Sequence, residues 1–154
     1  MEPILKVADL SKAFSRAGRD AFFAVDHVSF EVQPGEILGI VGESGSGKST
    51  IARLITRQID ATGGQIFIDG QDITRLRGRD LIPIYAKIQM VFQSPADSFD
   101  PRRTLGDGIC ESLRNKGVPK AEREAKARAL LESCGLPATF LARYPHQVSG
   151  GQCQ

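Results

Sequence analysis

The sequence lacks long hydrophobic runs, paired cysteines and a strong excess of charge of either sign. Its longest apolar run, residues 37–41, is far shorter than the roughly 20 residues of a membrane-spanning helix. Three cysteines lie far apart and form no CxxC pair, which predicts reduced thiols rather than a metal or redox site: Cys110, Cys134 and Cys153. The net charge of +2 does not favour binding to nucleic acid. The first residues do not match a secretory signal either.

The remaining composition is that of an ordinary globular domain. Of the 154 residues, 41% are hydrophobic and 25% charged, and this length is typical of one domain. Glycine is the exception, with 16 residues. Several of these glycines cluster in two short stretches, and those stretches indicate the function.

The first part of the chain is predicted to be rich in strands. Apolar and polar residues alternate over 4–10 and 28–32, as in half-buried strands, with a polar turn at 15–20 and further extended chain at 21–25. Two β-rich apolar runs, 36–41 and 88–93, favour buried strands of a parallel sheet. The sequence also predicts a helix over 49–58, a turn at 62–64 and a short strand over 65–70.

The later part is predicted to be helical. After a loop at 94–103, helical sequence extends over 105–141, and the clearest helix is 119–134. Its charges are spaced for ion pairs of Glu122 with Lys126 and of Glu124 with Arg128, and Gly135 is expected to end it. We take the charged side of this helix as a solvated face.

The first glycine cluster matches the phosphate-binding loop pattern G-x-x-x-x-G-K-[ST] without a mismatch. It comprises Gly42, Glu43, Ser44, Gly45, Ser46, Gly47, Lys48 and Ser49. The cluster lies between a predicted strand and a predicted helix, as the pattern requires. Glycines allow positive φ angles, so backbone N–H groups converge on a phosphate, and the helix N-terminus adds positive potential. A lysine for the outer phosphates and a hydroxyl for Mg²⁺ complete a nucleoside triphosphate site.

The second cluster is Val148-Ser149-Gly150-Gly151-Gln152 near the end of the sequence. A serine before two glycines at a predicted helix start makes a second corner suited to anions, with Ser149 as the N-cap. One nucleotide needs only one such corner.

In these motifs the chain resembles the ATP-binding subunits of ABC transporters. The resemblance covers essentially the whole chain: the loop 42–49, a Q-loop at Val91-Phe92-Gln93 and the signature motif 148–152. Shorter strings resemble the branch of oligopeptide, dipeptide and nickel importers, among them residues 92–95, 100–102 and 143–147. The family implies an α/β P-loop NTPase fold with an N-terminal antiparallel β part, a parallel core sheet and a helical subdomain. We expect residues 1–93 to form the nucleotide-binding core and residues 94–154 the helical subdomain.

The resemblance also implies the nucleotide contacts. Lys48 would contact the β- and γ-phosphates of ATP, Ser49 would hold Mg²⁺, and Thr50 would reach the α-phosphate. Gln93 would reach the Mg²⁺ or the attacking water. Phe14 occupies the family's adenine-stacking position, although it also fits a core phenylalanine, and Phe22 and Phe23 compete for the stacking role.

The family further implies partners. Two ATPase subunits close head to tail, so that Ser149, Gly150, Gly151 and Gln152 would cap the ATP of the second subunit. The Q-loop and helical subdomain would contact the transporter's membrane domains, with a substrate-binding protein as an indirect partner and no nucleic acid. The location would be peripheral, at the cytoplasmic face of the inner membrane. His146 precedes the signature motif, where a structural or capping role is favoured over that of a general base.

The sequence departs from the family at its end. It stops at Gln154, whereas the family continues with a strand that ends in a magnesium-linked Asp and a catalytic Glu, followed by a switch His. Cys153 stands where relatives usually have Arg. We therefore expect this chain alone to be inactive in hydrolysis and marginally stable. The rival hypothesis is a nucleotide-binding fragment without transport activity. A P-loop kinase would leave Gln93 and the signature motif unexplained, and the near-neutral charge disfavours a DNA-associated ABC ATPase.

Overall fold

The computed structural model describes residues 2–15, 21–92, 94 and 98–154. The chain forms two units, Met1–Met90 and Val91–Gln154, and each is described by itself. The polar turn predicted at 15–20 lies almost entirely outside the described residues, and so does Gln93.

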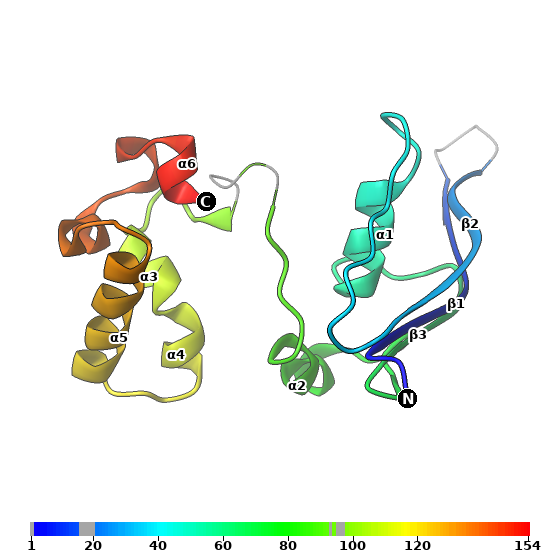
Figure 1. Cartoon of the computed structure of the whole chain (residues 1–154), viewed down its shortest axis with the longest axis horizontal. Coiled ribbons are helices and arrows are strands. Elements are labelled where there is room, and N and C mark those ends of the chain that lie inside the picture. Colours follow the sequence, from blue (N-terminus) through cyan, green and yellow to red (C-terminus); the bar gives the residue numbers. More distant parts are fainter. Residues whose placement is uncertain (1, 16–20, 93, 95–97) are drawn as a thin grey trace. The chain divides into compact units, whose positions relative to one another are not determined.

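The first unit is built on an antiparallel sheet with the strand order β2-β1-β3-β4 (Figure 1). Its bounds are β1 Leu5–Phe14, β2 Phe22–Val32, β3 Gly63–Ile68 and β4 Gln71–Asp72. The strands predicted over 4–10 and 28–32 are confirmed as parts of β1 and β2, and the extended chain at 21–25 belongs to the same strand as 28–32. The antiparallel register brings Leu5 opposite Val32 and Phe14 opposite Phe22. The hairpin thus carries two phenylalanines at the end where the chain passes from β1 to β2.

The β1–β2 ladder is interrupted by register shifts at residues with positive φ angles. Asp9 has φ 53° and His27 has φ 48°. The backbone N–H of Asp9 donates to Ser29 Oγ at 2.8 Å, and that of His27 donates to Ser11 Oγ at 3.0 Å. These side-chain oxygens satisfy backbone donors that the interrupted ladder leaves free, as bulged strands require.

Helix α1, Lys48–Ile55, packs on this sheet and carries the end of the phosphate loop. Its buried residues Ile51, Leu54 and Ile55 follow the helical spacing of three and four and join the sheet's apolar face. The core contains Val7, Leu10, Val25, Ile51, Leu54, Ile55, Ile66, Ile68, Ile73 and Ile84. The predicted helix over 49–58 is confirmed with an end three residues earlier. Two short helices follow the sheet, η1 Gly78–Leu81 and α2 Ile82–Tyr85.

Two predicted buried strands are wrong. Residues 36–41 and the described residues 88–92 form neither helix nor strand. Ile37 is 96% exposed, Val41 95% and Val91 75%. A parallel strand is stable only when neighbouring strands satisfy its N–H and C=O groups and cover both faces. No described segment pairs with these residues as a strand. Several of their apolar side chains are therefore exposed, although Ile88 packs partly buried against the core.

The turn predicted at 62–64 is also wrong, because β3 already begins at Gly63. Gly64 does have φ 82°, but it uses this conformation within the strand. A Cβ on Gly64 would overlap the backbone of Asp9 and Leu10. Glycine therefore permits the close approach of β3 to the irregular part of β1.

The second unit is helical, as predicted over 105–141. Its elements are α3 Leu105–Ile109, α4 Glu111–Asn115, α5 Lys120–Ser133, η3 Ala138–Ala142, η4 Pro145–Gln147 and α6 Gly150–Cys153. Leu105, Leu131 and Phe140 are the buried centre of its core. Gly135, with φ 72°, follows α5 as expected.

One of the two ion pairs predicted on α5 is confirmed. Lys126 Nζ lies 2.7 Å from Glu122 Oε1. Glu124 instead pairs with Lys120, with Nζ 3.6 Å from Oε1, and the described residues provide no ion pair to Arg128. Both spacings are i, i+4, and Glu124 takes the partner in the preceding turn.

Candidate functional site

The phosphate loop, together with both strands of the hairpin, lines a pocket of about 240 Å³ in the first unit. The pocket is lined by Phe14, Phe22, Ala24, Gly45, Ser46, Gly47, Lys48, Ser49 and Thr50. Most of the predicted nucleotide-binding residues thus lie around one space. Glu43 and Ser44 are outside the lining, and so is Gly42.

Two glycines of the loop need their conformational freedom. Gly45 has φ 84° and Gly47 has φ 93°. A Cβ on Gly47 would overlap the carbonyl oxygen of Ala24 in β2, whereas one on Gly45 would meet no atom within 4 Å. The expectation of positive φ is wrong for Gly42, where a Cβ would instead lie 2.7 Å from Ser46 Oγ. Gly47 fixes the distance between the loop and the hairpin.

The first turn of α1 presents backbone donors to the pocket. The first N–H groups of a helix have no acceptor within it. Among the described residues, Ile51 N–H donates to Gly47 O at 2.9 Å, but Ser49 and Thr50 N–H donate to no backbone acceptor. No side chain caps this helix at Gly47. Donors of this kind, with the positive end of the helix dipole, suit an anionic oxygen.

The ammonium group of Lys48 is held by its own loop. Nζ donates to Gly42 O at 2.7 Å, to Glu43 O and to Ser46 Oγ at 3.2 Å. These contacts place Gly42 and Glu43 in the site through their carbonyl groups. The positive charge is neutralised by no carboxylate among the lining residues, so it is available to an anion in the pocket.

Two aromatic rings form the other wall. Phe14 and Phe22 stack with ring centroids 5.8 Å apart and planes inclined by 29°. Lys12 Nζ lies 5.1 Å from the centre of the Phe14 ring. Phe23 is outside the lining, because successive side chains of a strand point to opposite faces. Of the three phenylalanines considered from the sequence, the structure brings Phe14 and Phe22 to the phosphate loop.

The second glycine cluster starts a helix, as predicted. Ser149 is the N-cap of α6, and its Oγ accepts from Gln152 N–H at 3.3 Å. The side chain of Gln152 accepts from Ser149 N–H at 3.0 Å in return, which completes a capping box. Ser149, Gly150, Gly151 and Gln152 are all exposed. These residues belong to the second unit.

His146 lies in η4, directly before this corner. Its ring stacks on Tyr144, with centroids 5.7 Å apart. The capping box of η4 is formed by Tyr144 and Gln147, so His146 does not cap it.

The three cysteines are free thiols, and partial burial raises the pKa of the Cys153 thiol, which disfavours its reactive form.

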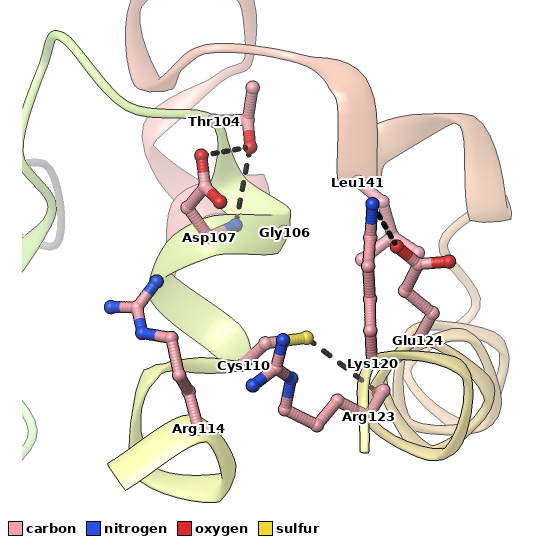
Figure 2. Close-up of a pocket in the computed structure, with 9 residues that line it drawn as sticks. All are labelled: Thr104, Gly106, Asp107, Cys110, Arg114, Lys120, Arg123, Glu124 and Leu141. Carbon is pink, nitrogen blue, oxygen red and sulfur yellow. Dashed lines mark hydrogen bonds and ion pairs between the residues drawn. The ribbon is translucent and has the colours of Figure 1, made fainter. Parts of the chain in front are cut away.

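Two features of the sites have no signal in a local sequence pattern. The contact between Gly47 and Ala24 depends on how β2 meets α1, which no local pattern records. The second unit also contains a polar pocket of about 190 Å³ (Figure 2). Its lining residues belong to no motif, and only their charges could have drawn attention to them.

Comparison with known proteins shows the family. A family profile described as ABC transporter matches residues 25–154. The chain therefore belongs to the ABC transporter family, as an ATP-binding domain of the P-loop NTPase fold.

The most similar relatives include a Brucella ovis protein named a peptide import ATP-binding protein. It is 43% identical over 154 residues, covering 99% of this chain and 48% of the relative. The glutathione import ATP-binding protein GsiA of Escherichia coli O157:H7 is 44% identical over 161 residues, covering 99% of this chain and 26% of the relative. The chain thus spans about half the length of the Brucella ovis relative and about a quarter of the length of GsiA.

Solved structures agree with this assignment. The ATP-binding cassette MJ0796, as a dimer in a post-hydrolysis state bound to ADP and Pi, superposes with a TM-score of 0.86 at 29% identity. The alignment covers 97% of this chain and 65% of that one. A second dimeric structure of MJ0796 gives a TM-score of 0.82 at 27% identity.

In the part of the chain that the structure describes, no helix has both the length and the apolar character needed to cross a membrane. The same residues contain no cluster of three or more His, Cys, Asp or Glu side chains placed to hold a metal ion.

Proposed function

We propose that the chain binds Mg–ATP at the pocket between the phosphate loop and the β1–β2 hairpin. The observation that carries this proposal is the convergence of free backbone donors, an ammonium group and an aromatic wall on one space. A side chain at position 47 would overlap Ala24, so the backbone of Gly47 is bare at this point of the loop, as the close approach of a phosphate requires.

Each part of the pocket has a separate task. Lys48 exchanges its loop carbonyl partners for the β- and γ-phosphates, and Thr50 contributes to the α-phosphate. Ser49 presents a hydroxyl of the kind that holds Mg²⁺ in such loops, and Gln93 is the second group that we assign to the metal. When bound, Mg²⁺ neutralises charge on the phosphate oxygens.

Adenine is assigned to the aromatic wall. Phe14 stacks on the base, and Phe22 supports the Phe14 ring from β2. Stacking on an aromatic face selects for a planar base without reading its hydrogen-bonding groups. The ring pair therefore contributes affinity for a nucleotide over bare phosphate.

The biological setting follows from the relatives, which are named as peptide and glutathione import ATP-binding proteins. We propose that the chain is the nucleotide-binding part of the ATPase subunit of an importer for peptide-like substrates. Its partners are a second ATPase subunit, capped head to tail by residues 149–152, and membrane domains contacted through the Q-loop and helical subdomain. The proposed location is the cytoplasmic face of the membrane.

ATP hydrolysis is proposed for the whole protein rather than for the pocket described above. Hydrolysis requires a group that positions the attacking water in addition to charge stabilisation. None of the described residues that line the pocket carries a carboxylate or an imidazole. We therefore expect the 154-residue chain to bind ATP with little or no turnover.

The test is equilibrium dialysis of ATP with Mg²⁺ against the chain, paired with a phosphate-release assay. Lys48→Ala is expected to weaken ATP binding by about tenfold or more, since a hydrogen bond to a charged group contributes about 1.5–3 kcal/mol. Lys87→Ala is the matched control, because Lys87 lies in the same unit and pairs with Asp69 instead of lining the pocket. Equal affinity in Lys48→Ala and the unmodified chain would refute the proposed site. Phosphate release above the Lys48→Ala background would refute the expected absence of turnover, but not the proposed binding site.

A further inference from the structure

The helical unit contains a second polar pocket that the proposed nucleotide site does not use. It lies between α3, α4, α5 and the end of η3, with a volume of about 190 Å³. Its charged lining residues are Arg114, Lys120 and Arg123 against Asp107 and Glu124. Basic groups are therefore in excess around a space too small for a drug-sized molecule, which needs roughly 300 Å³ or more.

The two carboxylates of this pocket are already engaged. Asp107 accepts a hydrogen bond from the Thr104 hydroxyl, with 3.0 Å between Oδ2 and Oγ1. Glu124 pairs with Lys120 at 3.6 Å. Because the Thr104 hydroxyl is neutral, Asp107 keeps its negative charge, and the two guanidinium groups of Arg114 and Arg123 exceed it by one positive charge.

Arg114 has one distant partner, and Arg123 has none among the described residues. Arg114 Nη2 lies 3.4 Å from Glu111 Oε1, a weak and partly exposed pair. The side chain of Arg123 makes no hydrogen bond or ion pair with any described residue. Its backbone N–H donates to Pro119 O at 3.0 Å, and its backbone oxygen accepts from the Cys110 thiol at 3.6 Å. Figure 2 shows Arg123 reaching from α5 toward Cys110 while Arg114 extends from α4 along α3.

The walls of the pocket are fixed by packing. Cys110 is buried at the pocket, and a Cβ on Gly106 would lie 2.7 Å from Leu141 O. This close contact ties α3 to η3, and the Thr104 N-cap fixes the first turn of α3. The α3 and η3 wall of the pocket is thus pre-formed, which lowers the ordering cost of binding.

We propose that this pocket binds a small oxyanion, a carboxylate or phosphate ion, through the guanidinium groups of Arg114 and Arg123. The guanidinium group presents paired N–H donors that match two oxygens of either ion. Arg123, which is partly buried and has no counter-ion among the described residues, gains most from such a ligand, because screening by water is reduced there. We expect dissociation constants of roughly a millimolar or below.

The test uses the full chain labelled with ¹⁵N-arginine, titrated separately with inorganic phosphate and with succinate at constant ionic strength. The Nε–Hε resonances of Arg114 and Arg123 are expected to shift together and saturate with at least one of the two ions. The readout reports on Arg114 and Arg123 themselves rather than on the phosphate loop 42–49.

Arg123→Gln is expected to weaken the response of Arg114 by about tenfold or more. Arg128→Gln is the matched control, since Arg128 lies on the same helix, is exposed and does not line the pocket. Both substitutions keep a good helix former, and far-ultraviolet circular dichroism checks that α5 is retained. Absence of saturable shifts with both ions, an undiminished response in Arg123→Gln, or an equal loss in Arg128→Gln would overturn the proposal.

Discussion

The aromatic wall gives a prediction that separates base recognition from phosphate binding. Phe22 is replaced by alanine, and Phe23→Ala serves as the matched control. The two rings are neighbours on β2 and similarly exposed, at 58% and 56%, but only Phe22 lines the pocket and stacks on Phe14. Because both rings are mostly in solvent, neither change should alter folding much.

The magnitude follows from the geometry of the ring pair. A centroid distance of 5.8 Å lies within the range where aromatic pairs contribute about 0.5–1.5 kcal/mol. Loss of that contact frees the Phe14 ring, and ATP must then order it on binding. We expect the dissociation constant for ATP to rise by about 2-fold to 10-fold in Phe22→Ala, with no change in Phe23→Ala.

Isothermal titration calorimetry with ATP and with inorganic tripolyphosphate measures both contributions. Tripolyphosphate has no base, so its affinity should be the same in the unmodified chain and in both variants. The reasoning is refuted if Phe23→Ala weakens ATP binding as much as Phe22→Ala does. It is refuted equally if Phe22→Ala weakens tripolyphosphate binding to the same extent as ATP binding.

Three further predictions concern stability and association. Gly45→Ala should lower the free energy of unfolding by about 1–2 kcal/mol, because alanine is strained in the left-handed conformation. Gly47→Ala should lower it by about 1–3 kcal/mol more, because its Cβ also overlaps the β2 backbone. Urea unfolding followed by circular dichroism measures both losses, and equal losses would contradict this prediction. The hydrogen bond and charge of Asp9 raise the pKa of His27. The stabilisation from this pair is therefore complete below pH 6.5 and is lost as the pH rises through the raised pKa, which lowers the melting temperature. His27→Gln should remove this pH-dependent fall in melting temperature, and an unchanged pH profile would count against the prediction. Ile37→Lys should reduce concentration-dependent light scattering because it places a charge in an exposed apolar run, whereas unchanged scattering would show that this run does not drive association.

The parts of the fold that sequence predicts correctly are those set by local pattern. Alternation found β1 and the later half of β2, and the phosphate-loop motif with the helical spacing of Ile51 and Leu54 located α1. Ser149 and Gln152 form the capping box that their spacing suggests. In each case the residues that determine the structure lie within a few positions of one another.

The wrong predictions depended on partners distant in sequence. The apolar runs 36–41 and 88–92 have the composition of buried strands, but a strand also needs neighbours that hydrogen-bond to it. Gly64 has the left-handed conformation expected of a turn, but it lies within β3, where this conformation allows close contact with Asp9 of β1. The site shows the same limit: the choice of Phe22 over Phe23 depends on the β1–β2 register, and no motif marks Arg114 or Arg123.

The central claim is that the phosphate loop holds the β- and γ-phosphates of a nucleotide. The most direct measurement is equilibrium dialysis of ATP, ADP and AMP against the same preparation of the chain in the presence of Mg²⁺. The account predicts that AMP binds at least about tenfold more weakly than ATP, because it lacks the phosphates that Lys48 and the N-terminus of α1 would contact. Equal affinities for AMP and ATP would contradict it.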